Sequence, residues 1–197
     1  MGGCLLLYIA RSRYDWGREF CENVFCRCRL DFCRRVPVTE FYVEKVLRVD
    51  LTIRGPYPVR DDLIVIEITG GSLSGIGAYA DKLSGMVKAP SGDALVVDAS
   101  GAFKRDVRLL AQMDDESFLH MEYGGRTRPN DAFNEKSEKG LEVGGDEVYF
   151  MIQPSFISAS PKYSWLSEHV FVGKMNTVVF PSPQTDGRVS YDIAKVS

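Results

Sequence analysis

The sequence is poor in the residues that usually build metal sites and hydrolytic triads. It has two histidines, His120 and His169, and all five cysteines lie within the first 33 residues. Zinc sites use closely spaced Cys and His ligands, so the rest of the chain is expected to hold neither a metal nor a Cys–His pair. Without later cysteines the fold needs no disulfide. That fits a reducing compartment, and hence a cytoplasmic protein, or a core large enough to be stable unaided.

Other absences disfavour further classes of protein. The net charge of −3 argues against a general nucleic-acid binder, because phosphate contacts need a basic surface. No apolar run approaches the roughly 18 residues that cross a bilayer. The segment TGGSLSGIG (69–77) is rich in glycine, but no helical period follows it. A dinucleotide site needs such a helix, so we expect a strand-to-strand corner here and no cofactor.

Residues 1–35 differ in character from the rest of the chain. They are rich in Arg and carry the spacing Cys21-x4-Cys26-x-Cys28-x4-Cys33. Zinc sites usually use CxxC-type pairs, which this spacing does not match. We therefore expect a poorly ordered or marginally helical extension, followed by a single domain over residues 36–197.

That domain shows the two-residue period of β-strands. Residues 91–123 predict three antiparallel strands, with Val107 and Leu109 on an apolar face and Arg108 on a polar face. Further strands are predicted at 41–53, 63–69, 148–156, 169–175 and 187–196. Residues 55–62 contain two prolines and predict a loop, 124–147 predict a long mobile loop, and 163–167 one helical turn. Many short strands separated by turns favour a β-sandwich or a β-barrel.

Three segments together resemble a known family. They are EITGGSLSG, the block from Gly92 to Gly125, and PKYSWLSEHVFVGK. In residue types and in order they resemble segments of the uncharacterised domain of unknown function 3237 family (uncharacterised protein family 0311). The resemblance covers residues 44–197. The resemblance implies an all-β fold: a closed antiparallel barrel with meander order and at most short helical turns. It also implies that the protein is often oligomeric, without an established activity. The loop at 130–146 looks longer than in the family, which would remodel the mouth of any pocket.

Candidate catalytic residues come from the central strands. Asp93 is either a general base at the mouth of a cavity or the cap of a turn. Arg108, which matches the family's arginine, is either a clamp for a carboxylate or enolate oxygen or half of an ion pair, with Asp93, Asp106 or Glu122 as partner. His120, beside Glu122 on its face, is either an oriented base or a surface residue.

Candidate substrate-binding residues are aromatic. Tyr123 and Tyr149 are placed to donate to a developing oxyanion, or are half-buried aromatics on a sheet. Trp165, with Tyr163, lines a hydrophobic site or plugs the end of the barrel.

Three functions remain open at this point. The first is a cofactor-free isomerase, cyclase or hydro-lyase of secondary metabolism, acting on an apolar carbonyl compound. The second is a barrel that binds a small ligand without changing it. The third is a structural or assembly module, with its polar face toward water and its apolar face packed against a partner subunit, as in a homo-oligomer. The first two require the polar side chains to converge inside a hollow barrel rather than face solvent.

Overall fold

The computed structural model describes residues 40–182 and 184–197, and the predicted N-terminal extension lies outside them. The strands are β1 (Val43–Arg60), β2 (Leu63–Gly75), β3 (Ser84–Val97), β4 (Phe103–Met113), β5 (Phe118–Arg128), β6 (Val143–Gly144), β7 (Tyr149–Ser158), β8 (Val170–Val179) and β9 (Gly187–Val196). One α-helix, α1 (Asp131–Glu138), and two 3₁₀ turns, η1 (Gly77–Tyr79) and η2 (Ser164–Glu168), complete the described part.

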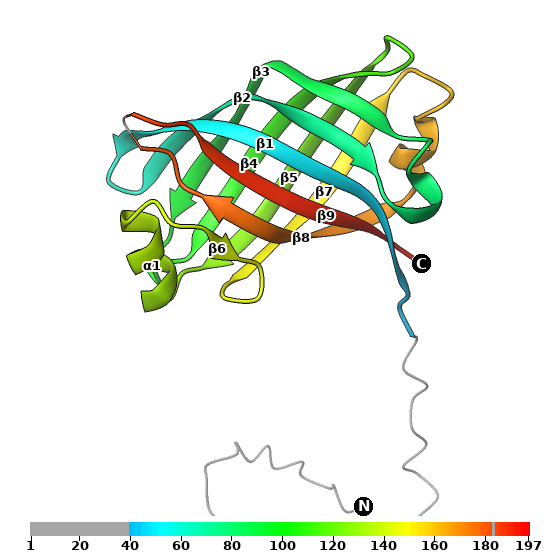
Figure 1. The fold of residues 1–197 in the computed structure, drawn as a ribbon. Helices are drawn as coiled ribbons and strands as arrows, with labels where there is room; N and C mark the ends of the chain where they lie inside the picture. The colour runs from blue at the N-terminus through cyan, green and yellow to red at the C-terminus, as the bar shows by residue number, and fades with distance from the viewer. Residues whose placement is uncertain (1–39, 183) are drawn as a thin grey trace, which may run out of the picture. The chain divides into compact units, whose positions relative to one another are not determined.

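Eight of these strands close into an antiparallel barrel (Figure 1). Consecutive strands from β1 to β5 are hydrogen-bonded neighbours, then β7 and β8 follow, and β9 pairs with both β8 and β1. The short strand β6 lies outside this cycle and pairs with β8 at Val143↔Val178. The predicted all-β barrel with meander order is therefore confirmed.

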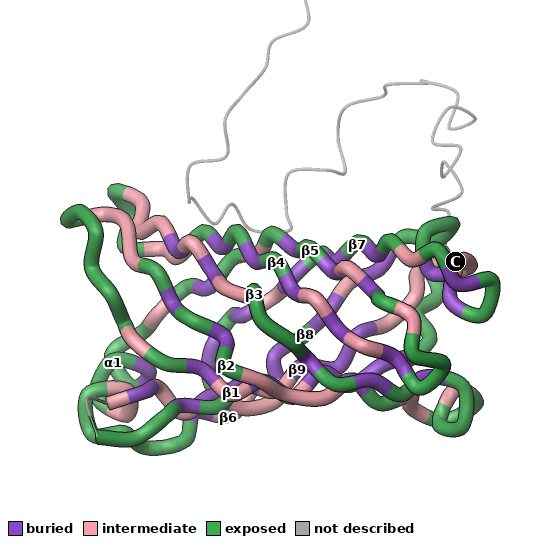
Figure 2. The backbone as a smooth tube through the Cα atoms, turned by 90° about the horizontal axis from the view of Figure 1, so that it is seen from above, coloured by how far each residue is buried: buried purple, intermediate pink, exposed green. Residues whose placement is uncertain are grey.

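Buried and exposed residues alternate along the strands of the barrel (Figure 2), as the two-residue period requires. Along β4, Val107, Leu109 and Ala111 are buried, while the residues between them are exposed or intermediate. An eight-stranded barrel is about wide enough for side chains to fill its interior. The buried apolar residues of all eight long strands form one cluster there.

Two segments that we expected to be loops contain regular structure. Strand β1 continues through Pro56 and Pro58 to Arg60, and its pairing with β2 shifts register on both sides of Pro58. Such irregularities are where a strand tolerates proline, because the missing N–H donor is not needed there. The expected loop 124–147 contains the end of β5, all of α1 and β6.

Helix α1 forms because its first turn is capped and one of its side chains is buried. The Asn130 side chain accepts a hydrogen bond from the Phe133 N–H at 2.8 Å, which is the usual N-cap arrangement. Phe133 is the buried residue of the helix, and its ring packs against Phe180. Among the described residues, no helix is long and apolar enough to cross a membrane.

Candidate functional site

A buried ion pair lies inside the barrel between neighbouring strands. Asp93 on β3 and Arg105 on β4 are 5% and 7% exposed, and Arg105 Nη1 is 2.5 Å from Asp93 Oδ2. The other carboxylate oxygen accepts a longer bond, 3.3 Å, from the Asp106 backbone N–H. Burial of both charges is tolerated because each neutralises the other. Asp93 Oδ1 keeps most of its capacity to accept a further hydrogen bond or a proton.

The Arg105 guanidinium is only partly satisfied by this pair. Its plane lies over the Phe150 ring, with 4.2 Å between the guanidinium carbon and the ring centroid. Its Nε is buried and has no hydrogen-bond partner among the described residues. A buried donor without a partner costs on the order of 1–3 kcal/mol, so this N–H is available to any oxygen that enters the barrel.

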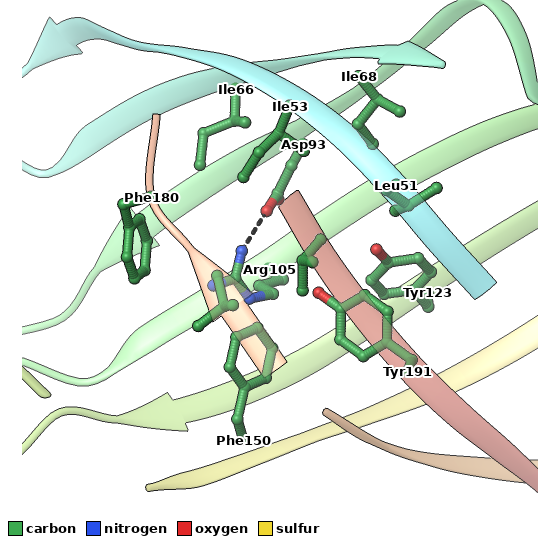
Figure 3. A pocket seen from close by; sticks show the side chains of 12 residues that line it. Leu51, Ile53, Ile66, Ile68, Asp93, Arg105, Tyr123, Phe150, Phe180 and Tyr191 are labelled. Atoms are coloured by element: carbon green, nitrogen blue, oxygen red, sulfur yellow. Dashed lines mark hydrogen bonds and ion pairs between the residues drawn. The ribbon is translucent and has the colours of Figure 1, made fainter. Parts of the chain in front are cut away.

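Two tyrosines, Tyr123 on β5 and Tyr191 on β9, stand beside the pair (Figure 3). Their rings meet edge to face at 5.8 Å, and the Tyr191 hydroxyl is turned toward Arg105. Burial raises the pKa of Tyr191 to about 12 and the pKa of Tyr123 well above its ordinary value. Both phenols are therefore neutral near pH 7, and the interior charge is balanced between one carboxylate and one guanidinium.

A small cavity touches these groups. Its volume is about 20 Å³, enough for about one water molecule. Besides the ion pair and the two tyrosines, it is lined by apolar side chains: Leu51, Ile53, Ile66, Ile68, Phe150, Val178, Phe180 and Val189. The site is thus a few polar atoms set in an apolar wall, which is the usual composition of a small-molecule site.

Two of the seven predicted residues, Asp93 and Tyr123, lie in this site. The expectation that Arg108 and Glu122 face a cavity inside the barrel is wrong. Arg108 is 62% exposed and pairs with Asp106 at 3.1 Å, and Glu122 stands opposite it on the outside of β5. The interior phase of β4 contains residues 105, 107 and 109, so Arg105 points inward and Arg108 outward.

The other predicted residues lie away from the ion pair. His120 is on the outer face of β5, between Leu110 and Ile157 of the neighbouring strands. Tyr149 is 56% exposed, and the Arg128 guanidinium lies 5.8 Å from its ring centroid. Trp165 is in η2 and stacks on Tyr79 at 5.4 Å.

Three residues of the site were not predicted: Arg105, Phe150 and Tyr191. A signal for Arg105 was present, because it shares the strand phase of Val107 and Leu109. A charge in phase with an apolar face is buried when the strand forms, and a buried charge needs a partner. Tyr191 is likewise in phase with Val189 and Ile193 on β9.

The model of a family described as "Protein of unknown function (DUF3237)" matches residues 41–196. The chain belongs to this family. The resemblance found in the sequence motifs is thereby confirmed.

Several other proteins are similar to most of the chain. A UPF0311 protein of Clostridium acetobutylicum is 28% identical over 140 residues, which are 68% of this chain and 85% of that protein. The crystal structure of a conserved protein of unknown function from Rhodopseudomonas palustris has a TM-score of 0.69 at 21% identity, covering 81% of this chain and 99% of the other. An enzyme from Penicillium herquei has a TM-score of 0.52 at 16% identity, covering 81% and 97%. The two structures share the fold of this chain.

Proposed function

We propose that this DUF3237 protein binds a small, uncharged, carbonyl-bearing apolar compound inside its barrel and moves a proton on it without a cofactor. The observation that carries the proposal is the buried Asp93–Arg105 pair, whose guanidinium Nε and carboxylate Oδ1 both have free hydrogen-bonding capacity. Isomerisation, cyclisation and hydration or elimination next to a carbonyl all need a base and an oxyanion donor. The ion pair provides one of each.

The roles follow from the atoms. A carbonyl oxygen would accept hydrogen bonds from Arg105 Nε and a tyrosine hydroxyl, which stabilise the negative charge that develops as an enolate forms. Asp93 Oδ1 would accept the proton from the carbon next to that carbonyl and return it to another position. The charges of Asp93 and Arg105 cancel one another, so a carboxylate ligand would bury an uncompensated negative charge. We therefore favour a neutral ketone or enone over an acid.

The likeness to the fungal protein supports this proposal in one respect. That protein is described as an enzyme and has the same fold, so a barrel of this type is compatible with catalysis.

The test is proton exchange. The protein is incubated in D₂O with a panel of neutral ketones, and deuterium incorporation is followed by NMR. We expect enzyme-dependent exchange that is lost in Asp93→Asn and strongly reduced in Arg105→Gln. Glu122→Gln and Arg108→Gln are the matched controls on the outer face and should leave exchange unchanged. Exchange that persists in the Asp93 and Arg105 variants, with their fold intact by circular dichroism, would refute the proposal.

The small volume of the cavity favours a second candidate, a barrel that binds nothing and serves as a structural module. With room for about one water, the interior is nearly filled by side chains. In this case the ion pair would serve to hold β3 against β4. If no ketone of the panel binds to the wild-type protein at millimolar concentration, this candidate replaces the first.

A further inference from the structure

At one end of the barrel three aromatic side chains pack together, and we call them the aromatic cap. Phe103 begins β4, Phe133 is on α1, and Phe180 follows β8. The Phe133 ring meets Phe180 at 5.4 Å and Phe103 at 6.2 Å, both edge to face. Phe180 also lines the cavity beside the ion pair (Figure 3). The cap therefore links the cavity to α1, which lies at this end of the barrel (Figure 1).

The opposite end of the barrel is packed more completely. Tyr163, just before η2, and Leu166, within η2, are 0% and 1% exposed. The rings of Phe156 and Phe171 meet at 5.1 Å beneath them. Trp165 and Tyr79 stack over this end. The cavity lies away from these residues, so a ligand would have the shorter path through the aromatic cap.

A second buried polar atom without a partner lies on β5, between a cap residue and the ring that stacks on Arg105. Thr127 is fully buried, and its Oγ1 has no hydrogen-bond partner among the described residues. It stands opposite Phe103 on one neighbouring strand and Phe150 on the other. Thr127 and Arg105 Nε thus offer two polar contacts, one near the cap and one at the pair, to a compound with an oxygen at each end.

Helix α1 is held in place by few interactions. Phe133 is its buried residue. Its other ties are at the surface: the Asn130 side chain donates to the Glu147 carbonyl at 2.8 Å, and Lys136 pairs with Glu147 at 2.5 Å. Exposed pairs of this kind contribute little. Phe133 is therefore the main buried contact that holds α1 against the barrel.

We infer that Phe133 sets the size of ligand that the barrel accepts, and that a ligand reaches the Asp93–Arg105 pair by displacing α1. This inference rests on the proposed function. With Phe133 in place the cavity holds about one water molecule. When Phe133 leaves, the space of its ring joins the cavity next to Phe180, and a compact aromatic ketone fits.

The experiment uses acetophenone as the probe and benzoate as its charged counterpart of similar shape. Binding to the full chain is measured by ligand-observed NMR and calorimetry for wild type, Phe133→Ala and Phe133→Leu. The Leu variant keeps an apolar anchor for α1 in case the Ala variant does not fold. Phe118→Ala is the matched control, because Phe118 is an exposed phenylalanine on the outside of β5. We expect Phe133→Ala to bind acetophenone about tenfold more tightly than wild type, with Leu between them and benzoate bound by none.

Two further variants separate this inference from the proposed function. Asn130→Ala removes the helix cap without changing the cavity, so it should raise the association and dissociation rates of acetophenone together, by about fivefold.

Adding Arg105→Met to Phe133→Ala should abolish the tighter binding. If it does not, the cap limits ligand size but Arg105 does not hold the ligand, and the proposed function fails. If Phe133→Ala and Phe133→Leu bind no better than wild type, or Asn130→Ala leaves the rates unchanged, the inference about Phe133 is overturned.

Discussion

The buried pair can be removed in two ways, and their difference shows whether the pair serves stability or chemistry. Replacing Arg105 by Met alone leaves the Asp93 carboxylate buried without its counter-charge, and Asp93→Leu leaves the guanidinium alone. Breaking a buried pair on one side costs about 3–5 kcal/mol. For a domain of this size about 1 kcal/mol shifts the melting temperature by roughly 2–4 °C, so each single variant should melt roughly 6–20 °C lower.

The double variant Asp93→Leu/Arg105→Met should recover most of this loss. It removes both charges, and it also removes the unpartnered Nε of Arg105. Replacing a buried ion pair by apolar residues of similar volume is often neutral, or stabilising by about 1–4 kcal/mol. We expect it to unfold near the wild-type temperature while failing to bind any ketone. A pair that can be replaced without loss of stability is better explained by the chemistry it performs.

The assay is urea unfolding of the four proteins, followed by circular dichroism and tyrosine fluorescence and analysed as a double-mutant cycle. The matched control is the exposed pair Arg108–Asp106, which lies on the same strand as Arg105. Its variants should change the unfolding free energy by no more than about 0.5 kcal/mol. If the double variant is as unstable as the two single variants, the pair is needed for the fold. The reasoning toward ligand chemistry is then refuted.

Three further predictions concern other parts of the barrel. Because burial raises the pKa of Tyr191 to about 12, its contribution to stability is complete below pH 10 and is lost as the pH rises toward 12. This loss, about 3 kcal/mol for a two-unit shift, should appear in urea unfolding at alkaline pH. Tyr191→Phe should lack this part of the loss and keep the part due to Tyr123, whose pKa burial also raises. Asp192 accepts side-chain hydrogen bonds from β1 and β8 at 2.8–2.9 Å, so Asp192→Ala should cost roughly 1–3 kcal/mol of unfolding free energy, whereas Asp192→Asn should recover part of it. Arg108→Ala and Glu122→Ala should leave both unfolding and ketone binding unchanged, and a loss of binding in either would return the site to the outer face.

The barrel was predictable because its determinants are local. The alternation of apolar and polar residues repeats along each strand, and the turn residues separate one strand from the next. Strand order followed as well, because neighbours in a meander are neighbours in sequence. The limits of β1 and the helix in the 124–147 segment were missed. In both cases tertiary contacts decide. Register shifts across Pro56 and just after Pro58 accommodate the prolines, and the burial of Phe133 stabilises a helix with little apolar character of its own.

The site was harder to predict because it depends on which face of each strand is inside. Arg105 and Arg108 lie three residues apart on β4, and the phase of the alternation places one inside and the other outside. We expected the face that carries most of the polar residues to line the cavity. In a barrel this face is the exterior, and the functional candidates are the few charges in phase with the apolar residues. The convergence of Tyr191 with Asp93 could not be derived from periodicity, because it results from closure of β9 onto β1.

The same closure explains why ligand binding and stability should oppose one another in this protein. An interior of eight strands is filled by its own side chains, so space for a ligand arises only when one of them leaves. Phe133 is suited to leave, because it belongs to a short helix outside the barrel rather than to a strand. Its departure exposes an aromatic ring and leaves the cap open, and the ligand must offset both. Variants that loosen the cap should therefore bind ligand more tightly and unfold more easily. Variants of the strand residues around the pair should lose ligand affinity and stability together.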